Sequence, residues 1–250
     1  MMRPGDRMRI VIVLFALALA VLARPAAAAG FSDWGAIVVA GDHRAHDGSD
    51  SEVFDDGRRD VGAALERIGV KPGNIVEFST EPQNYRAPAP LHSDPDSIAS
   101  ALWDLSNRAT AGCFVYLTSH GSPDGAIVGD DMLSPKDLSR MVNNACGDRP
   151  TAIVVSACFS GVFVPALAGP NRFVLTAARP DRTSFGCGQA DRYTFFDECF
   201  LSSIAQTHDF RDLAIDTRRC VAAREKKENA SPPSDPQAAL GDNLASFPTW

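Results

Sequence analysis

Five short apolar runs, rich in β-branched and aromatic residues, are spaced along the chain. Such runs are typical of strands that are buried on both faces of a parallel sheet. In the stretches between them, apolar residues recur every three or four positions, which predicts helices. The predicted strands cover residues 37–40, 75–78, 114–119, 152–157 and 173–176, and the predicted helices cover residues 60–68, 97–107, 134–144, 195–204 and 210–224. This alternation predicts an α/β fold with a mostly parallel sheet between layers of helices.

Capping signals mark the ends of three of these helices. Ser134 is followed by Pro135 and Asp137, which is the pattern of an N-cap, a first-position proline and a first-turn carboxylate. Asp96 is expected to cap the helix over residues 97–107, and Gly69 is expected to end the first helix.

Polar stretches are predicted as loops and turns over residues 41–57, 79–96 and 122–131, the last containing a small hairpin. From residue 225 the chain becomes polar and contains Pro232-Pro233, which predicts a connector. We therefore expect one domain over residues 30–224, followed by a connector and tail over residues 225–250.

The first 29 residues have the pattern of a secretory signal peptide. A basic start is followed by an apolar run over residues 10–22, and the small residues 26–29 offer a cleavage site before Gly30. An uncleaved membrane anchor is the alternative, although the apolar run is shorter than a spanning helix usually needs. We expect an exported protein, periplasmic or secreted, that has no stable membrane span after cleavage.

Composition narrows the range of partners. The net charge is −7, and the first 29 residues hold four arginines and one aspartate, so the rest of the chain is more acidic still. An acidic chain without basic clusters is a poor candidate for binding nucleic acid. His43 and His46 lie among aspartates, but their spacing matches no strong ligand pattern, so we predict no metal site.

Two of the apolar runs end in residues with useful chemistry. One leads to His120-Gly121 and the other to Ala157-Cys158. Ligands in open α/β sheets bind beyond the carboxyl ends of the strands. If the two strands are neighbours, His120 and Cys158 lie at the same edge of the sheet, as a nucleophilic Cys–His pair requires.

These strings resemble the legumain (asparaginyl endopeptidase) family of the caspase–legumain clan of cysteine peptidases. The resemblance is carried by the His-Gly motif, by residues 156–161, and by the segments 34–41 and 175–178, and it covers roughly residues 34–220. It implies a caspase-like three-layer sandwich in an exported member of bacterial type. It also implies that a Pro-Gln segment after residue 235 adds a late strand to the sheet.

The resemblance implies a cysteine endopeptidase that needs no cofactor and acts on a peptide or protein substrate. Cys158 would attack the scissile carbonyl and form a thioacyl-enzyme. His120 would protonate the leaving amine and then activate water. The backbone N–H groups of Gly121 and Cys158 would form the oxyanion hole.

The specificity pocket departs from the family pattern. The position of the family's arginine, which binds an Asn side chain at P1 (the substrate residue before the scissile bond), falls on Asp56, and a family glutamate is replaced by Ser156. Ser184 and Asp197 match other pocket positions. A pocket containing Asp56 and Asp197 predicts a basic P1 residue.

A small shift in register changes this prediction. Arg58 or Arg59 would then enter the pocket, and preference for Asn or Asp at P1 would return. The sequence leaves these alternatives open.

Six cysteines follow the signal peptide, and export favours their pairing. If Cys158 is free, at least one more of the six is free or pairs between chains. Pairing of Cys113 with Cys146 is attractive, because each precedes one of the two catalytic strands. The alternative is that all six form three disulfides.

Two other functions use the same fold. A transamidase or transpeptidase would share the thioacyl intermediate and pass it to an amine instead of water. A non-catalytic exported binding protein would keep the fold and use Cys158 in a disulfide.

Overall fold

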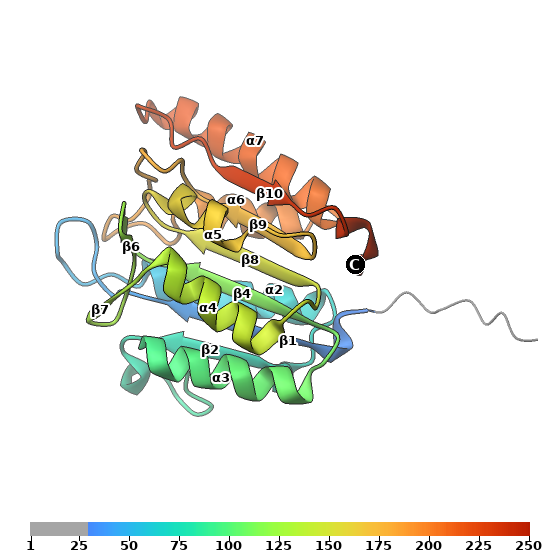
Figure 1. Cartoon of the computed structure of the whole chain (residues 1–250). Helices are drawn as coiled ribbons and strands as arrows, with labels where there is room; N and C mark the ends of the chain where they lie inside the picture. Colours follow the sequence, from blue (N-terminus) through green and yellow to red (C-terminus); the bar gives the residue numbers. More distant parts are fainter. Residues whose placement is uncertain (1–29) are drawn as a thin grey trace, which may run out of the picture.

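The computed structural model describes residues 30–250, so the predicted signal peptide lies outside the described residues. A seven-stranded sheet with the order β10-β9-β8-β4-β1-β2-β3 runs through the molecule (Figure 1). Its strands are β1 (Trp34–Ala40), β2 (Ile75–Ser79), β3 (Leu91–His92), β4 (Gly112–Thr118), β8 (Thr151–Ser156), β9 (Arg172–Thr176) and β10 (Gln237–Leu240). All neighbouring strands are parallel except β9 and β10.

Helices cover both faces of this sheet (Figure 1). The helices are α2 (Val53–Arg67), α3 (Pro95–Arg108), α4 (Pro135–Cys146), α5 (Val164–Leu167), α6 (Phe195–Ile204) and α7 (Phe210–Glu228). Alternate residues of each central strand enter opposite cores. In β1, Ala36 and Val38 pack with α2, α6 and α7, whereas Ile37 and Val39 pack with α3 and α4. The predicted three-layer α/β sandwich is therefore confirmed.

A second, small sheet follows β4. It consists of β5 (Gly121–Ser122), β6 (Gly125–Val128) and β7 (Asp131–Leu133), all antiparallel. The region predicted to hold one hairpin therefore forms a three-stranded meander. Short 3-10 turns, labelled η1 to η5, complete the chain at Phe31–Asp33, Pro72–Asn74, Pro82–Asn84, Ser160–Phe163 and Leu244–Ser246.

Helix starts differ from the sequence prediction in two places. The helix predicted from residue 60 begins at Val53, because Val53 and Phe54 are buried and anchor about two further turns. The prediction of a loop over residues 41–57 was therefore wrong for residues 53–57. The N-cap of α3 is Asp94 and not Asp96, since the Asp94 side chain accepts a hydrogen bond from the Ser97 N–H at 2.8 Å.

Other boundaries agree or lie close. Ser134 caps α4 and Gly69 follows α2 with a positive φ, both as predicted. The last helix, α7, continues to Glu228, four residues past the predicted end. Its final turn is held because the buried Glu225 accepts a hydrogen bond from the Ser234 N–H at 3.0 Å. The tail then forms β10 along β9.

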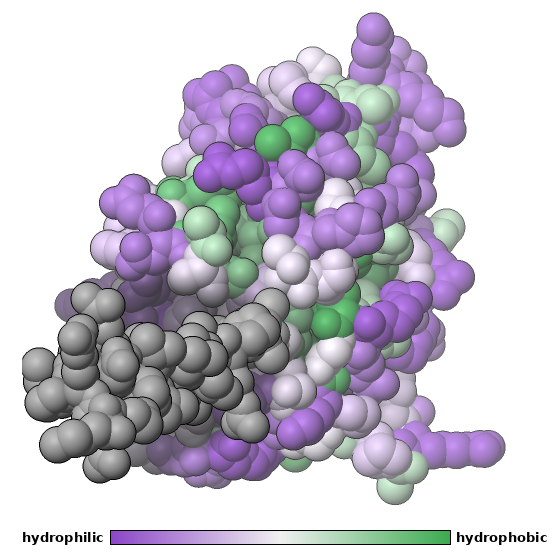
Figure 2. All heavy atoms as spheres, turned by 90° about the vertical axis from the view of Figure 1, so that its right-hand side faces the viewer, coloured by the Kyte–Doolittle hydropathy of each residue, from purple (hydrophilic) through white to green (hydrophobic). Residues whose placement is uncertain are grey.

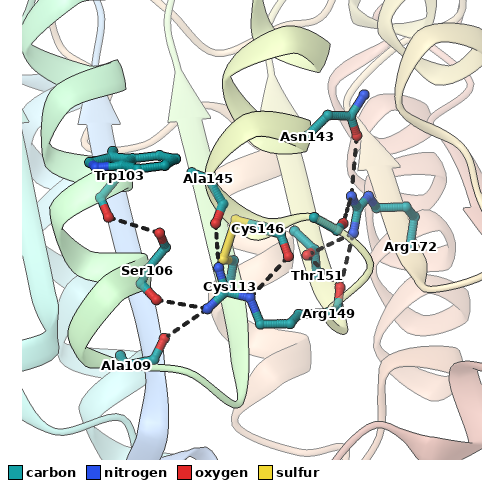
Figure 3. Close-up of a disulfide and its surroundings, with 11 residues drawn as sticks. Trp103, Ser106, Ala109, Cys113, Asn143, Ala145, Cys146, Arg149, Thr151 and Arg172 are labelled. Atoms are coloured by element: carbon teal, nitrogen blue, oxygen red, sulfur yellow. Dashed lines mark hydrogen bonds between the residues drawn. A yellow bond between two sulfur atoms is a disulfide. The ribbon is translucent and has the colours of Figure 1, made fainter.

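Two disulfides lie in different layers. Cys113 in β4 is bonded to Cys146 in α4 (Figure 3), and Cys199 in α6 is bonded to Cys220 in α7. The suggested Cys113–Cys146 pair is confirmed, and the alternative of three disulfides is wrong, because Cys158 and Cys187 are free.

The chain enters β1 at the edge of the sheet where the other parallel strands also begin (Figure 1). Figure 2 views this side of the molecule, and its visible surface is mostly hydrophilic, with hydrophobic residues in separate small areas. Within residues 30–250, no helix combines the length and the hydropathy needed to cross a membrane.

Candidate active site

The candidate site lies at the carboxyl ends of three neighbouring strands: β1, β4 and β8. The chain adds β2 and β3 on one side of β1 and then returns to add β4, β8 and β9 on the other. Such a change of direction opens a crevice at the carboxyl ends of the strands. Thr118 at the end of β4 pairs with Ser156 at the end of β8. His120 and Cys158 each follow two residues later, so the structure brings them to the same edge.

The ring of His120 is held by two contacts. Its Nε2 lies 2.9 Å from the backbone carbonyl oxygen of Arg44. The ring also meets Phe54 edge-on, with 5.0 Å between the ring centroids. A carbonyl oxygen can only accept, so Nε2 carries the proton in this hydrogen bond. In the neutral ring, Nδ1 is then the basic nitrogen and is available to exchange a proton.

The Arg44 carbonyl is aimed by its own loop. Asp42 Oδ1 accepts hydrogen bonds from the N–H groups of His43 and Arg44, at 2.7 and 3.0 Å. Arg44 also forms an isolated bridge with Asp50. The polar segment after β1 is therefore an ordered turn that orients the His120 imidazole.

Cys158 lies on a sharp turn between β8 and the 3-10 turn that follows it. Its sulfur accepts a hydrogen bond from the Ser184 N–H at 3.2 Å and lies 3.6 Å from the Ser184 hydroxyl. The next residue, Phe159, has φ of 57°, a left-handed conformation that is uncommon for a large side chain. Its N–H donates to the Arg182 carbonyl at 2.7 Å, which compensates for this backbone strain.

Gly121 lies against the backbone of Cys158. A Cβ on Gly121 would come within 2.3 Å of the Cys158 carbonyl oxygen, so only glycine fits here. The Ile127 N–H donates to the His120 carbonyl at 2.9 Å. Gly121 pairs with Ala126 next to this bond, so its own N–H points away from β6. The Cys158 N–H has no acceptor among residues 30–250. Both N–H groups are thus available to a substrate oxygen.

Asp197 lies below this edge and is fully buried. Its carboxylate accepts hydrogen bonds from Tyr116 at 2.7 Å and Thr118 at 2.6 Å. Burial raises the pKa of the Asp197 carboxyl, and the hydrogen bonds from Thr118 and Tyr116 lower it in part. The predicted pocket residue Ser156 is also buried, and its hydroxyl lies 3.2 Å from that of Thr194, the N-cap of α6. Asp197 and Ser156 therefore contribute buried hydrogen bonds that link the ends of β4 and β8 to α6.

The charged residues of α2 are paired. Arg58 is buried between Asp55 and Glu77, at 2.8 and 2.6 Å, and does not reach the surface. Arg59 forms an ion pair with Asp56. The side chain of Arg59 is 47% exposed and that of Asp56 is 16% exposed. Of the two arginines considered from the sequence, Arg59 is thus the one with an accessible guanidinium.

Three contributors to the site were not identified from the sequence: Asp42, Arg44 and Phe54. Phe54 packs on His120 and also on Cys187, which joins a small cluster with Ala40 and Val53. Burial raises the pKa of the Cys187 thiol to about 11. No cluster that would hold a metal ion occurs among the residues described by the structure.

The fold and the paired strand ends define a cysteine peptidase of the caspase-like class. The model of the peptidase C13 family matches residues 80–227, and the chain belongs to this family. Among solved structures, caspase-1 from Spodoptera frugiperda is similar, with a TM-score of 0.60 and 14% sequence identity over 86% of this chain and 90% of that chain. Curated proteins give no match by sequence. With a free Cys158 and this family membership, the alternative of a non-catalytic binding protein is not supported.

Proposed function

We propose that this peptidase is an endopeptidase that uses Cys158 and His120 as its catalytic dyad. The observation that carries the proposal is the hydrogen bond from His120 Nε2 to the Arg44 carbonyl at 2.9 Å, at the sheet edge that also holds the free Cys158. This bond leaves Nδ1 as the basic nitrogen of the ring.

In the first step, Nδ1 of His120 takes the proton of the Cys158 thiol, and the sulfur attacks the scissile carbonyl carbon to form a carbon–sulfur bond. The carbonyl oxygen takes up negative charge and accepts hydrogen bonds from the N–H groups of Gly121 and Cys158. The carbon–nitrogen bond then breaks, and the His120 imidazole gives its proton to the leaving amine. The product is a thioacyl-enzyme.

In the second step, His120 accepts a proton from water, which attacks the thioester. The carbon–sulfur bond breaks, the acid product leaves, and His120 returns its proton to the Cys158 sulfur. If an amine enters instead of water, the same thioacyl-enzyme yields a new peptide bond, which is transpeptidation.

The test is cleavage of a fluorogenic peptide library varied at P1, with the protein starting at Gly30. Cys158→Ala should abolish turnover, and His120→Ala should reduce kcat by about 10²- to 10⁴-fold. Cys187→Ala is the matched control, because it removes the other free thiol and should retain activity. Equal activity of the Cys158→Ala and wild-type proteins would refute the proposal.

Adding an acceptor amine to the same assay separates the two outcomes of the thioacyl-enzyme. Hydrolysis predicts that mass spectrometry finds mainly the free acid. A product carrying the added amine would favour a transpeptidase.

We propose that the P1 side chain of the substrate binds next to the start of α2. Asp56 and Arg59 form an ion pair there, and the Ser184 N–H donates a hydrogen bond to the Cys158 sulfur. A basic P1 preference that disappears in Asp56→Asn would assign the pocket to the carboxylate. A preference for Asn or Asp that disappears in Arg59→Gln would assign it to the guanidinium.

We also propose that the protein is exported after cleavage before Gly30. Its two disulfides support this proposal, because such bonds persist mainly in oxidising compartments. N-terminal sequencing of the protein from cell fractions tests it. Protein that starts at Met1 and stays with the membrane would indicate the anchor instead.

A further inference from the structure

A cavity of about 500 Å³ lies between α7 and two loops of the chain, one that follows β9 and one that precedes β10. Four arginines line it, Arg179, Arg182, Arg218 and Arg219. Such a concentration of guanidinium groups is unexpected in an acidic chain. It lies on the α7 side of the sheet, beyond the carboxyl end of β9, which is the neighbour of β8.

The carboxylates nearby leave hydrogen-bond donors of these arginines free. Arg179 and Arg182 share one carboxylate, Asp181, at 3.0 and 2.8 Å. Each guanidinium has five N–H donors, so one shared carboxylate uses only part of them. A further carboxylate would bind here with the charge-assisted geometry that guanidinium groups favour.

The two arginines on α7 are held loosely. Arg218 lies 3.9 Å from Asp235, and Arg219 lies 3.5 Å from Asp216. Their side chains are 49% and 78% exposed. Both guanidinium groups are thus accessible to an incoming anion.

The lining also contains Glu225, whose carboxylate accepts a hydrogen bond from Ser234, and Asp235, and the rest of it is apolar. Ile215 is 39% exposed, and Ala222 and Pro236 lie beside it. A small inorganic anion would not use this surface. An acidic side chain attached to a polypeptide would use both the guanidinium groups and the apolar wall.

A short segment of the chain, residues 182–184, connects the lining of the cavity to the nucleophile. The Arg182 carbonyl accepts the N–H of Phe159, and Ser184 holds the sulfur of Cys158. Arg182 and Ser184 are two residues apart, so their Cα atoms are separated by at most about 7 Å. An extended substrate rises about 3.3 Å per residue, so a side chain two to four positions from the scissile bond reaches the cavity.

We propose that this arginine-lined cavity is a subsite for a Glu or Asp side chain of the polypeptide substrate, two to four residues from the scissile bond. The inference rests on the proposed peptidase function, and it adds a preference that P1 alone does not supply. Binding to the inactive protein tests it independently of catalysis.

The test measures binding of fluorescent peptides to Cys158→Ala protein by anisotropy. The peptides carry Glu, Gln or Lys at one position within four residues of the scissile bond. Since partly exposed charge pairs contribute about 0.2–1 kcal/mol, the Glu peptide should bind about two- to fivefold more tightly than the Gln peptide. This difference should shrink as ionic strength rises and the Debye length falls from about 30 Å at 0.01 M to about 3 Å at 1 M.

Charge reversal supplies the decisive comparison. Arg218→Glu/Arg219→Glu changes only exposed side chains of α7, so it should preserve the fold and reverse the preference toward the Lys peptide. Arg140→Glu on α4 is the matched control, because Arg140 also pairs with an aspartate three residues earlier and is 63% exposed. The control should leave the preference for Glu unchanged.

Three results would overturn the subsite. One is equal binding of the Glu and Gln peptides, and another is the same loss in the Arg140→Glu protein. The third is complete displacement of the Glu peptide by inorganic phosphate. That result would make the cavity a site for free anions. Failure of the wild-type protein to cleave any peptide would count against the proposed function and leave the binding comparison intact.

Discussion

The two free thiols, Cys158 and Cys187, have different surroundings. Cys158 is half-buried at the carboxyl end of β8, with hydrogen bonds to Ser184. Cys187 packs against Val53 and Phe54. Because burial penalises the charged thiolate, it raises the pKa of Cys187 to about 11.

We therefore expect iodoacetamide to modify Cys158 and not Cys187 at neutral pH. The thiolate is the nucleophile, and Cys187 remains protonated until the pH approaches 11. Peptide mapping by mass spectrometry checks this, with denatured protein as the control in which both thiols react. Faster labelling of Cys187 than Cys158 in the native protein would contradict the assignment.

The carboxyl of Asp197 predicts a pH dependence of stability. Burial raises its folded pKa above 3.8, its ordinary value, so the ionised form is disfavoured by folding. The protonated carboxyl therefore contributes to the free energy of unfolding. This contribution is fully present below the ordinary pKa and is lost as the pH rises through the folded pKa. Asp197→Asn lacks this loss, so its free energy of unfolding should improve relative to wild type as the pH rises from acid toward neutral. Urea unfolding at several pH values measures the difference, and a parallel pH dependence of the two proteins would refute it.

The placement of His120 and Cys158 at one edge of the sheet could be predicted because both residues follow recognisable apolar runs. Gly121 could be predicted from the same motif. The Arg44 carbonyl could not, because every residue carries such a group and only the fold selects one. The burial of Asp197 could not be predicted either, since its hydrogen-bond partners Tyr116 and Thr118 are distant in sequence.

At the scale of elements, one arginine joins the ends of two helices. The guanidinium of Arg149 donates to the carbonyls of Ser106 at 2.8 Å and Ala109 at 3.3 Å, at the end of α3 (Figure 3). It also donates to Cys146 at 3.0 Å and to Ala145, at the end of α4. Terminal carbonyls of a helix lack partners within the helix and carry partial negative charge. Arg149 therefore caps both helices at once.

Arg149→Ala should lower the free energy of unfolding by about 2–4 kcal/mol, because hydrogen bonds from a charged donor to these carbonyls are lost. Chemical denaturation measures the change. The control is Arg140→Ala on the exposed face of α4, for which a change within about 0.5 kcal/mol is expected. An equal effect of both substitutions would show that the helix ends do not depend on Arg149.

The sequence was sufficient for elements that are buried on both faces. Strands such as β4 and β8 have continuous apolar runs, and their position in the sheet follows from that pattern. The early start of α2 was missed because Val53 and Phe54 are apolar within a polar stretch, and only tertiary contacts show that they are buried. Asp94 was missed because two aspartates flank Pro95, and the choice between them depends on the backbone conformation.

At the scale of the whole molecule, each disulfide fastens one helical layer. Cys113–Cys146 links the sheet to α4 on one face, and Cys199–Cys220 links α6 to α7 on the other. The bonded residues are 33 and 21 positions apart. Closing loops of this length removes conformational entropy from the unfolded chain.

Replacing either pair with Ala should therefore cost about 3–4 kcal/mol, and the two losses should be nearly additive because the bonds lie in different layers. Thermal and urea unfolding of the two double variants and of the combined variant measure the costs. Activity of the folded variants should persist, since neither pair contacts His120 or Cys158. Loss of turnover in a variant that is still folded would show that a disulfide acts on the site.

The arrangement of the cysteines has a consequence for the free thiol of Cys158. Cys113 is near the start of β4, at the end of the strand opposite to that followed by His120. The bonded cysteines pair within one helical layer or at its junction with the sheet. Cys158 is left at the far edge of the sheet, beyond reach of either pair. Neither disulfide therefore consumes the thiol that we propose as the nucleophile.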